Sequence, residues 1–353
     1  MPTPRTPIVD GHLDLAENVT LFGRDLTASV QEIRAHERRS REQATVSLPE
    51  MSRGGIAVAI ATVTAGFLVA DVGEDFQPRS ALYSTPEEAE AQALRQIDLY
   101  RRWEREARVR LILSSADLAH HLELWRADGL PGLVFLMEGA DPIVHVSDLG
   151  DWWRRGLRII GLTFGDTRYG AGVAGGSAEP KSGGLTDAGV EMLAEMAACG
   201  FAWDVSHLTE EGIWQGLEAG APRVCASHAN AQALTPTNRH LSDPVIAAIA
   251  ARRGVIGVVL YNRFLESAWR RDGAVTVTVE HDVRRHIDHI AGVAGWSAVG
   301  IGSDLDGGLG REESPQEIET IADLGTIGSV VPDHARAAVL GENWLTFLRA
   351  ALP

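Results

Sequence analysis

The chain has 353 residues, of which 45% are hydrophobic and 23% are charged, and its formal net charge is −16. This balance is typical of a globular protein and excludes a disordered or fibrous chain. The negative charge argues against nucleic acid and membrane surfaces as partners, since both attract concentrated positive charge. The N-terminus lacks the apolar run of a signal peptide, and no stretch of about 18 apolar residues occurs. We therefore expect a cytoplasmic protein without a membrane span.

Lysine and cysteine are both scarce, and this limits the catalytic mechanisms and metal sites that the chain can have. Lys181 is the only lysine among the 32 basic residues. Lys181 is therefore the one residue that could form a Schiff base, act as a lysine general base or, when carboxylated, bridge two metal ions. Cys199 and Cys225 are too few for a disulfide framework or a Cys-rich zinc site, and we expect buried free thiols.

Short apolar runs rich in Val and Ile recur along the chain, and a helix-like segment follows each of them. Near-continuous apolar runs are typical of parallel strands that helices cover on both faces. The runs lie at 7–13, 55–64, 132–138, 157–164, 201–206, 223–228, 255–261 and 298–304, and helices are expected at 86–108, 186–199 and 243–253. A further run at 109–113 is a candidate strand outside this set.

Eight strand–helix repeats predict an α/β protein, a (β/α)8 TIM-like barrel, folded as a single domain over residues 1–353. A doubly wound open sheet is the alternative, because strand count alone does not show that a sheet closes. The Gly-rich segment 165–185 carries no phosphate-binding motif. Because it follows a strand, we expect a surface loop on the active face of the barrel, where a lid could form.

Metal-capable side chains fall at the ends of several of these runs. Because the carboxyl ends of barrel strands meet at one rim, we expect these side chains to converge. They are His12 and Asp14 after the first run, Glu138 after the third, His207 and His228 after the fifth and sixth, and Asp304 and Asp306 after the eighth. Any one of them alone is more often structural, for example as a helix cap. Together they predict a zinc site, and since Lys181 lies in the Gly-rich segment, the bridge between two zinc ions should be Glu138.

Seven segments carry a resemblance to a known family. They are VDGHLDLAENV at 9–19, FLMEGADPI at 135–143, GLTDAGVEMLAEMAACGFAWDVSHLT at 184–209, ASHANAQAL at 226–234, NRHLSD at 238–243, VGIGSDLDG at 299–307 and VLGENWL at 339–345. The chain resembles the renal (membrane) dipeptidase family, zinc dipeptidases with an amidohydrolase-like barrel. The resemblance extends over nearly the whole chain.

This resemblance implies two zinc ions per chain and a role for each site residue. His12 and Asp14 would hold one ion and His207 and His228 the other, with Glu138 as the bridge and a water or hydroxide between the ions as nucleophile. Asp304 resembles the aspartate that carries the proton to the leaving amine, although Asp306 stays an alternative. Arg239 resembles the arginine that pairs with the substrate carboxylate, and Tyr261 a tyrosine that assists there.

Two positions depart from the family pattern. Phe164 stands where the family carries a histidine that stabilises the oxyanion, and Arg168 or Tyr169 could take its place. His240 follows Arg239 where asparagine is more usual. Both departures affect the expected substrate preference more than metal binding.

The leading hypothesis is a zinc-dependent dipeptidase that hydrolyses short dipeptides, including L-Xaa-D-Xaa substrates. Another amidohydrolase-type reaction, such as lactone or amide hydrolysis at the same binuclear site, is the alternative. A non-catalytic binding protein is a third reading, but every ligand position is filled. The expected partner is a small dipeptide, and the sequence leaves open whether the chain forms a homodimer.

Overall fold

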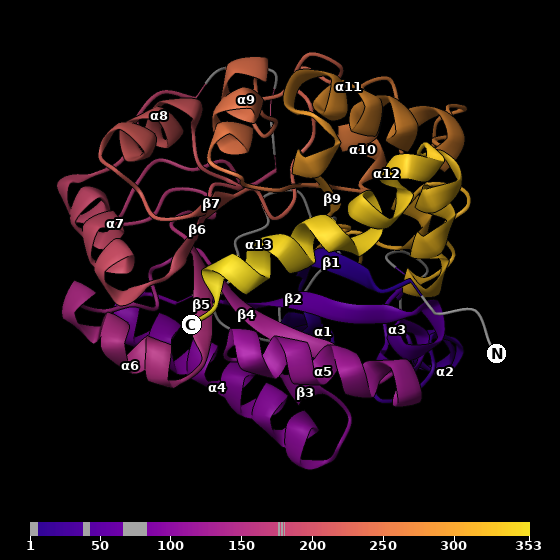
Figure 1. Ribbon diagram of the computed structural model, residues 1–353, viewed down its shortest axis with the longest axis horizontal. Helices are drawn as coiled ribbons and strands as arrows, with labels where there is room; N and C mark the ends of the chain where they lie inside the picture. Colours follow the sequence, from indigo (N-terminus) through magenta and orange to yellow (C-terminus); the bar gives the residue numbers. More distant parts are fainter. Residues whose placement is uncertain (1–5, 38–42, 66–82, 176, 178, 180) are drawn as a thin grey trace.

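The structure is a computed structural model that describes residues 6–37, 43–65, 83–175, 177, 179 and 181–353. Its centre is a sheet of parallel strands with the order β7-β6-β5-β4-β2-β1-β9-β8 (Figure 1). These strands are β1 (Ile8–Leu13), β2 (Ile56–Thr64), β4 (Gly132–Glu138), β5 (Leu157–Gly161), β6 (Ala202–Asp204), β7 (Val224–Cys225), β8 (Ile256–Val258) and β9 (Val299–Ile301).

The two ends of this strand order meet, because Ala226 directly after β7 pairs in parallel with Ile256 of β8. The sheet is therefore a nearly closed barrel, which confirms the expected α/β barrel and excludes the open sheet. All eight predicted strands are present. The ninth candidate run contains a two-residue strand, β3 (Arg110–Leu111), which pairs with β4 outside this path.

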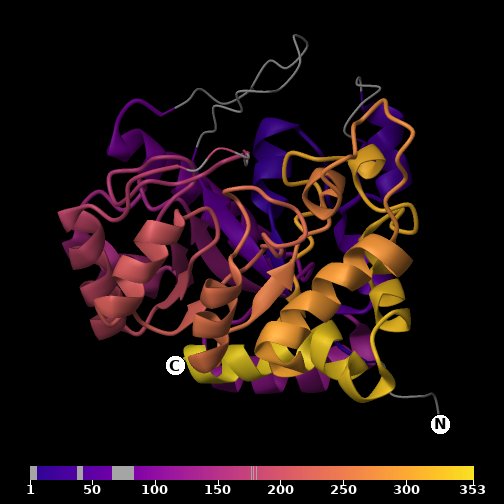
Figure 2. The same cartoon turned by 90° about the horizontal axis from the view of Figure 1, so that it is seen from above.

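Helices surround the barrel (Figures 1 and 2). They are α1 (Leu15–Leu21), α2 (Val30–His36), α3 (Leu48–Gly54), α4 (Pro86–Arg105), α5 (Ser115–Asp128), α6 (Leu149–Arg154), α7 (Asp187–Cys199), α8 (Glu210–Glu218), α9 (Asp243–Ala251), α10 (Asn262–Leu265), α11 (Arg284–Ala294), α12 (Asp333–Ala337) and α13 (Asn343–Ala351). Helix α7 begins as predicted, since the Thr186 hydroxyl accepts a hydrogen bond from the Gly189 N–H, and it ends at the left-handed Gly200.

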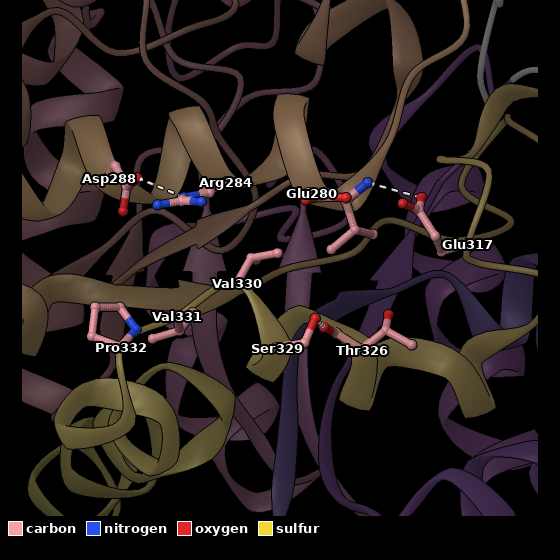
Figure 3. A pocket seen from close by; sticks show the side chains of 10 residues that line it. Glu280, Arg284, Asp288, Glu317, Thr326, Ser329, Val330, Val331 and Pro332 are labelled. Carbon is pink, nitrogen blue, oxygen red and sulfur yellow. Dashed lines mark hydrogen bonds and ion pairs between the residues drawn. The ribbon is translucent and has the colours of Figure 1, made fainter.

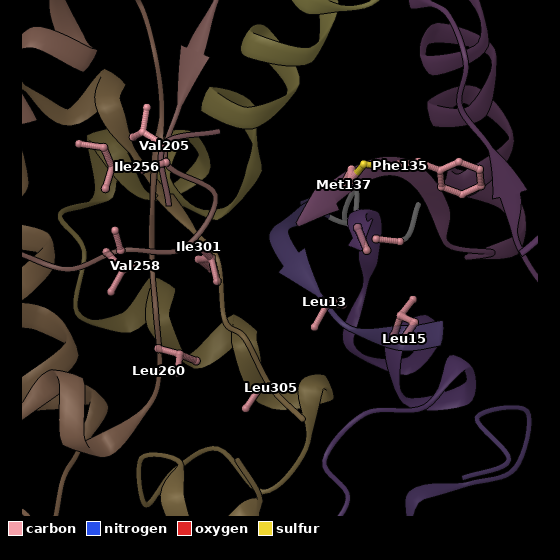
Figure 4. Close-up of a cluster of buried hydrophobic side chains, with 14 of the residues drawn as sticks. Leu13, Leu15, Phe135, Met137, Val205, Ile256, Val258, Leu260, Ile301 and Leu305 are labelled. Atoms are coloured by element: carbon pink, nitrogen blue, oxygen red, sulfur yellow. The ribbon is translucent and has the colours of Figure 1, made fainter. Parts of the chain in front are cut away.

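The two faces of several strands contribute to two separate hydrophobic clusters. In β4, Phe135 and Met137 belong to the larger cluster, which packs strands against the surrounding helices (Figure 4). Val134 and Leu136 alternate with them and join a smaller cluster that includes Trp344 of α13. Because successive side chains of a strand point to opposite faces, this alternation continues to Glu138, which lies on the same face as Val134 and Leu136.

Glycines allow strands β7, β8 and β9 to approach each other closely beside Ser227. A Cβ atom built on Gly257 would lie 2.0 Å from the Ser227 carbonyl oxygen, and one built on Gly302 would lie 1.8 Å from it. Any larger residue would push these strand ends apart. The close approach brings Ser227 into the centre of the rim, where the predicted site residues gather.

None of the helices in the described part of the chain is long and apolar enough to cross a membrane. A cytoplasmic location stays a prediction. Cys199 and Cys225 are both free thiols, and Cys225 is buried.

Candidate functional site

Three predicted histidines surround the Glu138 carboxylate at the rim. The Glu138 Oε1 atom lies 3.4 Å from Nε2 of His12, 3.1 Å from Nε2 of His207 and 3.6 Å from Nε2 of His228. The Nε2 atoms of His207 and His228 are 2.9 Å apart. All four residues are buried. The barrel thus brings together side chains from four separate strand ends.

One hydroxyl group determines which nitrogens of His12 and His228 carry protons. Ser227 Oγ lies 3.0 Å from His12 Nδ1 and 2.8 Å from His228 Nδ1. The Ser227 hydroxyl itself donates to Asp204 Oδ2 at 2.5 Å, so its single proton is in use. Both imidazoles must therefore donate from Nδ1 to Ser227, and each keeps a lone pair on Nε2.

The third histidine has the same protonation for a different reason. His207 Nδ1 donates to the Val173 carbonyl oxygen at 2.6 Å, which leaves a lone pair on its Nε2. Burial lowers the pKa of His12, His207 and His228 well below the usual value, so the imidazoles stay neutral. Three lone pairs and a carboxylate oxygen then point toward the same space.

This donor set fits a cation. The buried His12 Nε2 has no hydrogen-bond partner among the described residues. Neutral imidazole nitrogens and carboxylate oxygens are the donors that zinc prefers, and each imidazole is oriented through its other nitrogen, as is usual for metal ligands. A positive ion between these atoms would be coordinated by several of them at once.

His12 also belongs to a second group of possible donor atoms. Ligand atoms of His12, Asp14 and Asp304 lie within 4.8 Å of one another, as do those of His12, Glu138 and His228. The Thr62 hydroxyl donates a hydrogen bond to Asp14 Oδ1. Burial, followed by the Glu138 charge, raises the pKa of Asp14. The two groups share His12, and His207 belongs to neither of them among the described residues.

The structure separates the two aspartates after β9. Asp306 accepts hydrogen bonds from the Thr45 N–H, the Thr45 hydroxyl and the Val46 N–H, so its carboxylate secures the segment before α3. Asp304 keeps its carboxylate beside Asp14. Both aspartates adopt left-handed backbone conformations, with φ of 58° and 66°, as does His207 with φ of 66°. Such strain in non-glycine residues is typical of functional sites.

Arg239 is buried next to the histidines. Its Nη2 atom donates to His207 Nε2 and to the His228 carbonyl oxygen, both at 3.0 Å. Its buried Nε–H has no acceptor among the described residues. The guanidinium lies over the Phe264 ring, 5.9 Å from its centroid, and Phe264 contacts Tyr261. The structure thus brings Arg239 to the metal donors and Tyr261 to the same side of the rim.

The described part of the Gly-rich segment contacts this site. Val173 donates its N–H to the His207 carbonyl oxygen at 2.7 Å, and Ser177 donates its N–H to Asn238 Oδ1 at 2.8 Å. Lys181 forms an ion pair with Asp166 within the same segment, away from the donor atoms. The predicted position on the active face is therefore correct, and the lysine is not part of the metal centre.

The position of the expected oxyanion histidine is apolar. The Phe164 ring lies 4.5 Å from the His207 ring, between centroids. Arg168 and Tyr169 do not replace the missing donor. The Arg168 guanidinium donates to the carbonyl oxygens of Asp141, Ile143 and Val144, and the Tyr169 hydroxyl donates to Ile143. These two side chains support the loop after β4 instead.

Four residues around the site were missed from the sequence. Thr62, Asp204 and Ser227 orient the predicted ligands, and Glu17 adds a buried carboxylate near them. Ser227 lies directly before His228, and Asp204 opens the DVSH segment, so proximity to predicted ligands was the available signal.

A separate cavity of about 570 Å³ lies beside α11, away from these residues (Figure 3). Its lining includes Glu280, Asp288 and Glu317, with one arginine, Arg284, which is paired with Asp288 at 3.3 Å. None of the predicted site residues lines it. The cavity therefore adds nothing to the metal centre.

Zinc binding is expected to release protons. Burial raises the pKa of Glu138 to about 8, so the metal-free carboxyl group carries a proton at pH 7 that a cation must displace. The histidines contribute none, because their pKa is lowered. Calorimetric titration in buffers of different protonation enthalpy should show release of more protons per chain at pH 7 than at pH 9, because the Glu138 contribution is lost once this carboxyl group is already ionised. Release that does not change between these pH values would contradict the protonation state derived for Glu138.

Comparison with known proteins identifies the family. Residues 3–348 match the family model described as membrane dipeptidase, peptidase family M19. The chain belongs to this family. The resemblance inferred from the sequence is thereby confirmed, and the M19 chain is a metallo-dipeptidase by family.

Two relatives and one solved structure show what this M19 chain is similar to. An uncharacterised protein from the pqqA 5′ region of Klebsiella pneumoniae is 33% identical over 69% of this chain and 89% of its own length. An uncharacterised dipeptidase of Schizosaccharomyces pombe is 29% identical over 68% of this chain and 56% of its own length. The crystal structure of a metallopeptidase from Rhodobacter sphaeroides, liganded with a phosphinate mimic of the dipeptide L-Ala-D-Ala, is 25% identical. It covers 98% of this chain and 99% of its own, with a TM-score of 0.78.

Proposed function

We propose that the chain is a zinc-dependent dipeptidase that hydrolyses short dipeptides, including L-Xaa-D-Xaa substrates, at two zinc ions bridged by Glu138. The observation that carries this proposal is the set of three Nε2 lone pairs around the Glu138 carboxylate. The L-Ala-D-Ala mimic bound by the Rhodobacter sphaeroides metallopeptidase supports the choice of substrate.

The metal ligands divide between the two ions. His12 and Asp14 would hold one ion, and His207 and His228 the other. Zinc lowers the pKa of a bound water and polarises a carbonyl group, which supplies the nucleophile and part of the oxyanion stabilisation. Ser227 keeps His12 and His228 in the protonation state that ligation requires.

Asp304 would carry the proton. Burial, together with the Asp14 and Glu138 charges, raises the pKa of Asp304 well above its usual value. A carboxylate in this environment accepts a proton readily from the attacking water and can pass it to the leaving amine. The Asp304 carboxylate forms no hydrogen bond with a described residue and is free to exchange a proton. The Asp306 carboxylate, in contrast, accepts hydrogen bonds from Thr45 and Val46.

Arg239 would bind the C-terminal carboxylate of the dipeptide, with Tyr261 beside it. Replacement of Arg239 by methionine is therefore expected to raise KM by about 10²-fold or more, since a buried charge-assisted pair is lost. The measurement is steady-state kinetics on L-Ala-D-Ala with metal content monitored, because Arg239 also contacts His207. Arg284→Met, on α11, is the control. An unchanged KM would remove Arg239 from the substrate site.

A substrate screen tests the proposed function. Metal-loaded protein should release free amino acids from a panel of L,L and L,D dipeptides, and chelator-treated protein should not. Lactones belong in the same screen, because Phe164 places an apolar ring where a polar oxyanion donor was expected. Hydrolysis of lactones without hydrolysis of any dipeptide would replace the dipeptidase by the alternative amidohydrolase reaction.

A further inference from the structure

A buried carboxylate near the metal donors has no partner. Glu17 lies in the first turn of α1, three residues after Asp14, and is 8% exposed. Its carboxylate forms no hydrogen bond or ion pair with any residue in the described part of the chain. A buried, unpaired carboxylate is unfavourable unless a cationic group compensates for it.

Other carboxyl groups lie around Glu17. Burial, followed by the charges of Asp14, Glu138 and Asp304, raises the pKa of Glu17. Glu17 is nevertheless absent from both groups of donor atoms that lie within 4.8 Å of one another among the described residues. Its position thus suits a positive group on a bound molecule better than a further metal ion.

Glu17 is an acid and Arg239 a base, and both lie close enough to the same two acidic residues to interact with them electrostatically. These two acidic residues are Glu138 and Asp304. Arg239 contacts His207 and the backbone after β7, whereas Glu17 belongs to the helix that follows β1. A free dipeptide is a zwitterion with a carboxylate at one end and an ammonium group at the other. The site therefore offers a carboxyl group for the ammonium end and a guanidinium for the carboxylate end.

We propose that Glu17 binds an ammonium group on the N-terminal residue of the substrate. Glu17 would then recognise dipeptides that carry a free amine, while Arg239 binds the carboxylate at the other end. This inference rests on the proposed dipeptidase function. The ammonium N–H groups donate hydrogen bonds to the Glu17 carboxylate. The α-amine of any dipeptide or the side chain of an N-terminal lysine can supply this group, and the two sources are separated experimentally.

The test measures binding to metal-loaded protein by calorimetry. The ligands are phosphinate mimics of L-Ala-D-Ala with a free or an acetylated amine, and mimics with lysine or norleucine as the N-terminal residue. Wild type is expected to prefer the free amine by about 10- to 100-fold, and Glu17→Gln to lose most of this preference. Affinity for the acetylated mimic should be the same in both proteins. If the lysine side chain is the source, Glu17→Gln loses the preference for lysine over norleucine instead.

Two variants control for structural effects. Glu17→Asp keeps the charge and should retain part of the preference, and Glu87→Gln removes an exposed glutamate from the corresponding first turn of α4 without effect. The proposal is overturned if Glu17→Gln keeps both wild-type preferences, or if wild type shows neither. Because binding requires no turnover, hydrolysis of L-Ala-D-Ala by the same samples tests the dipeptidase function separately.

Discussion

The Asp304→Asn variant is expected to bind two zinc ions and to hydrolyse dipeptides with a kcat lowered by about 10²- to 10⁴-fold, the usual contribution of a positioned acid–base group. Asparagine has nearly the same shape as aspartate but cannot accept and return a proton. The backbone at this position is already left-handed, with φ of 58°, and asparagine tolerates that conformation well. Steady-state kinetics and metal analysis on the same preparation provide the measurement.

Asp306→Asn is the matched control, two residues further along the same loop. Its carboxylate accepts from the Thr45 and Val46 backbone N–H groups and the Thr45 hydroxyl. Loss of the charge should lower the free energy of unfolding by about 1–3 kcal/mol, with kcat of the folded, metal-loaded protein largely kept. Near wild-type kcat for Asp304→Asn would show that Asp304 is not the proton carrier, whereas loss of its zinc would show that Asp304 is a metal ligand.

The Glu138→Gln variant is expected to lose the binuclear centre. A neutral amide does not provide the negative charge that two adjacent cations share, and its NH2 group can donate to the histidine Nε2 atoms instead. Zinc content should fall from two ions to below one per chain, with turnover falling in parallel. Metal analysis after dialysis against a weak chelator measures this loss. Retention of two tightly bound ions would contradict the bridging role.

The same substitution should stabilise the metal-free protein. The pKa of Glu138 is raised to about 8 in the folded state, above its usual value of 4.5, so the folded protein binds the proton more tightly than the unfolded chain. Ionisation therefore destabilises the fold progressively as pH rises from about 4.5 to about 8. Thermal unfolding at pH 8 should show a higher Tm for metal-free Glu138→Gln than for metal-free wild type.

A second buried glutamate provides a control for this effect. Glu313 is as buried as Glu138 but forms an ion pair with Arg271, away from the metal donors. Glu313→Gln weakens that pair, so it should lower the Tm of the protein and leave zinc binding intact. Opposite effects of the two substitutions on Tm would separate the bridging carboxylate from an ordinary buried ion pair.

The barrel could be predicted because its strands are buried on both faces. Continuous apolar runs mark such strands, and all eight predicted runs contain one. Five of the eight runs extend beyond the strands at their carboxyl ends, as in 298–304, where β9 ends at Ile301. There the chain leaves the ladder and enters the left-handed conformation at Asp304. The apolar pattern of the sequence does not show this change of backbone conformation, so it does not show where the strand ends.

The types of site residue could be predicted, but their protonation and partners could not. His12 and His228 are recognisable as ligands at strand ends, whereas their shared contact with Ser227 depends on how closely β7, β8 and β9 approach. Glu17 was overlooked because an acidic residue in the first turn of a helix is also expected from the helix dipole alone. Only the folded arrangement shows that it is buried among carboxylates.

Titration of zinc into metal-free protein, followed by L-Ala-D-Ala hydrolysis at each point, tests the binuclear dipeptidase most directly. We predict that turnover is absent without metal, rises with added zinc, and reaches its maximum at two equivalents per chain. Maximal turnover at one equivalent would contradict the shared centre around Glu138. Absence of turnover with two ions bound would contradict the proposed dipeptidase function itself.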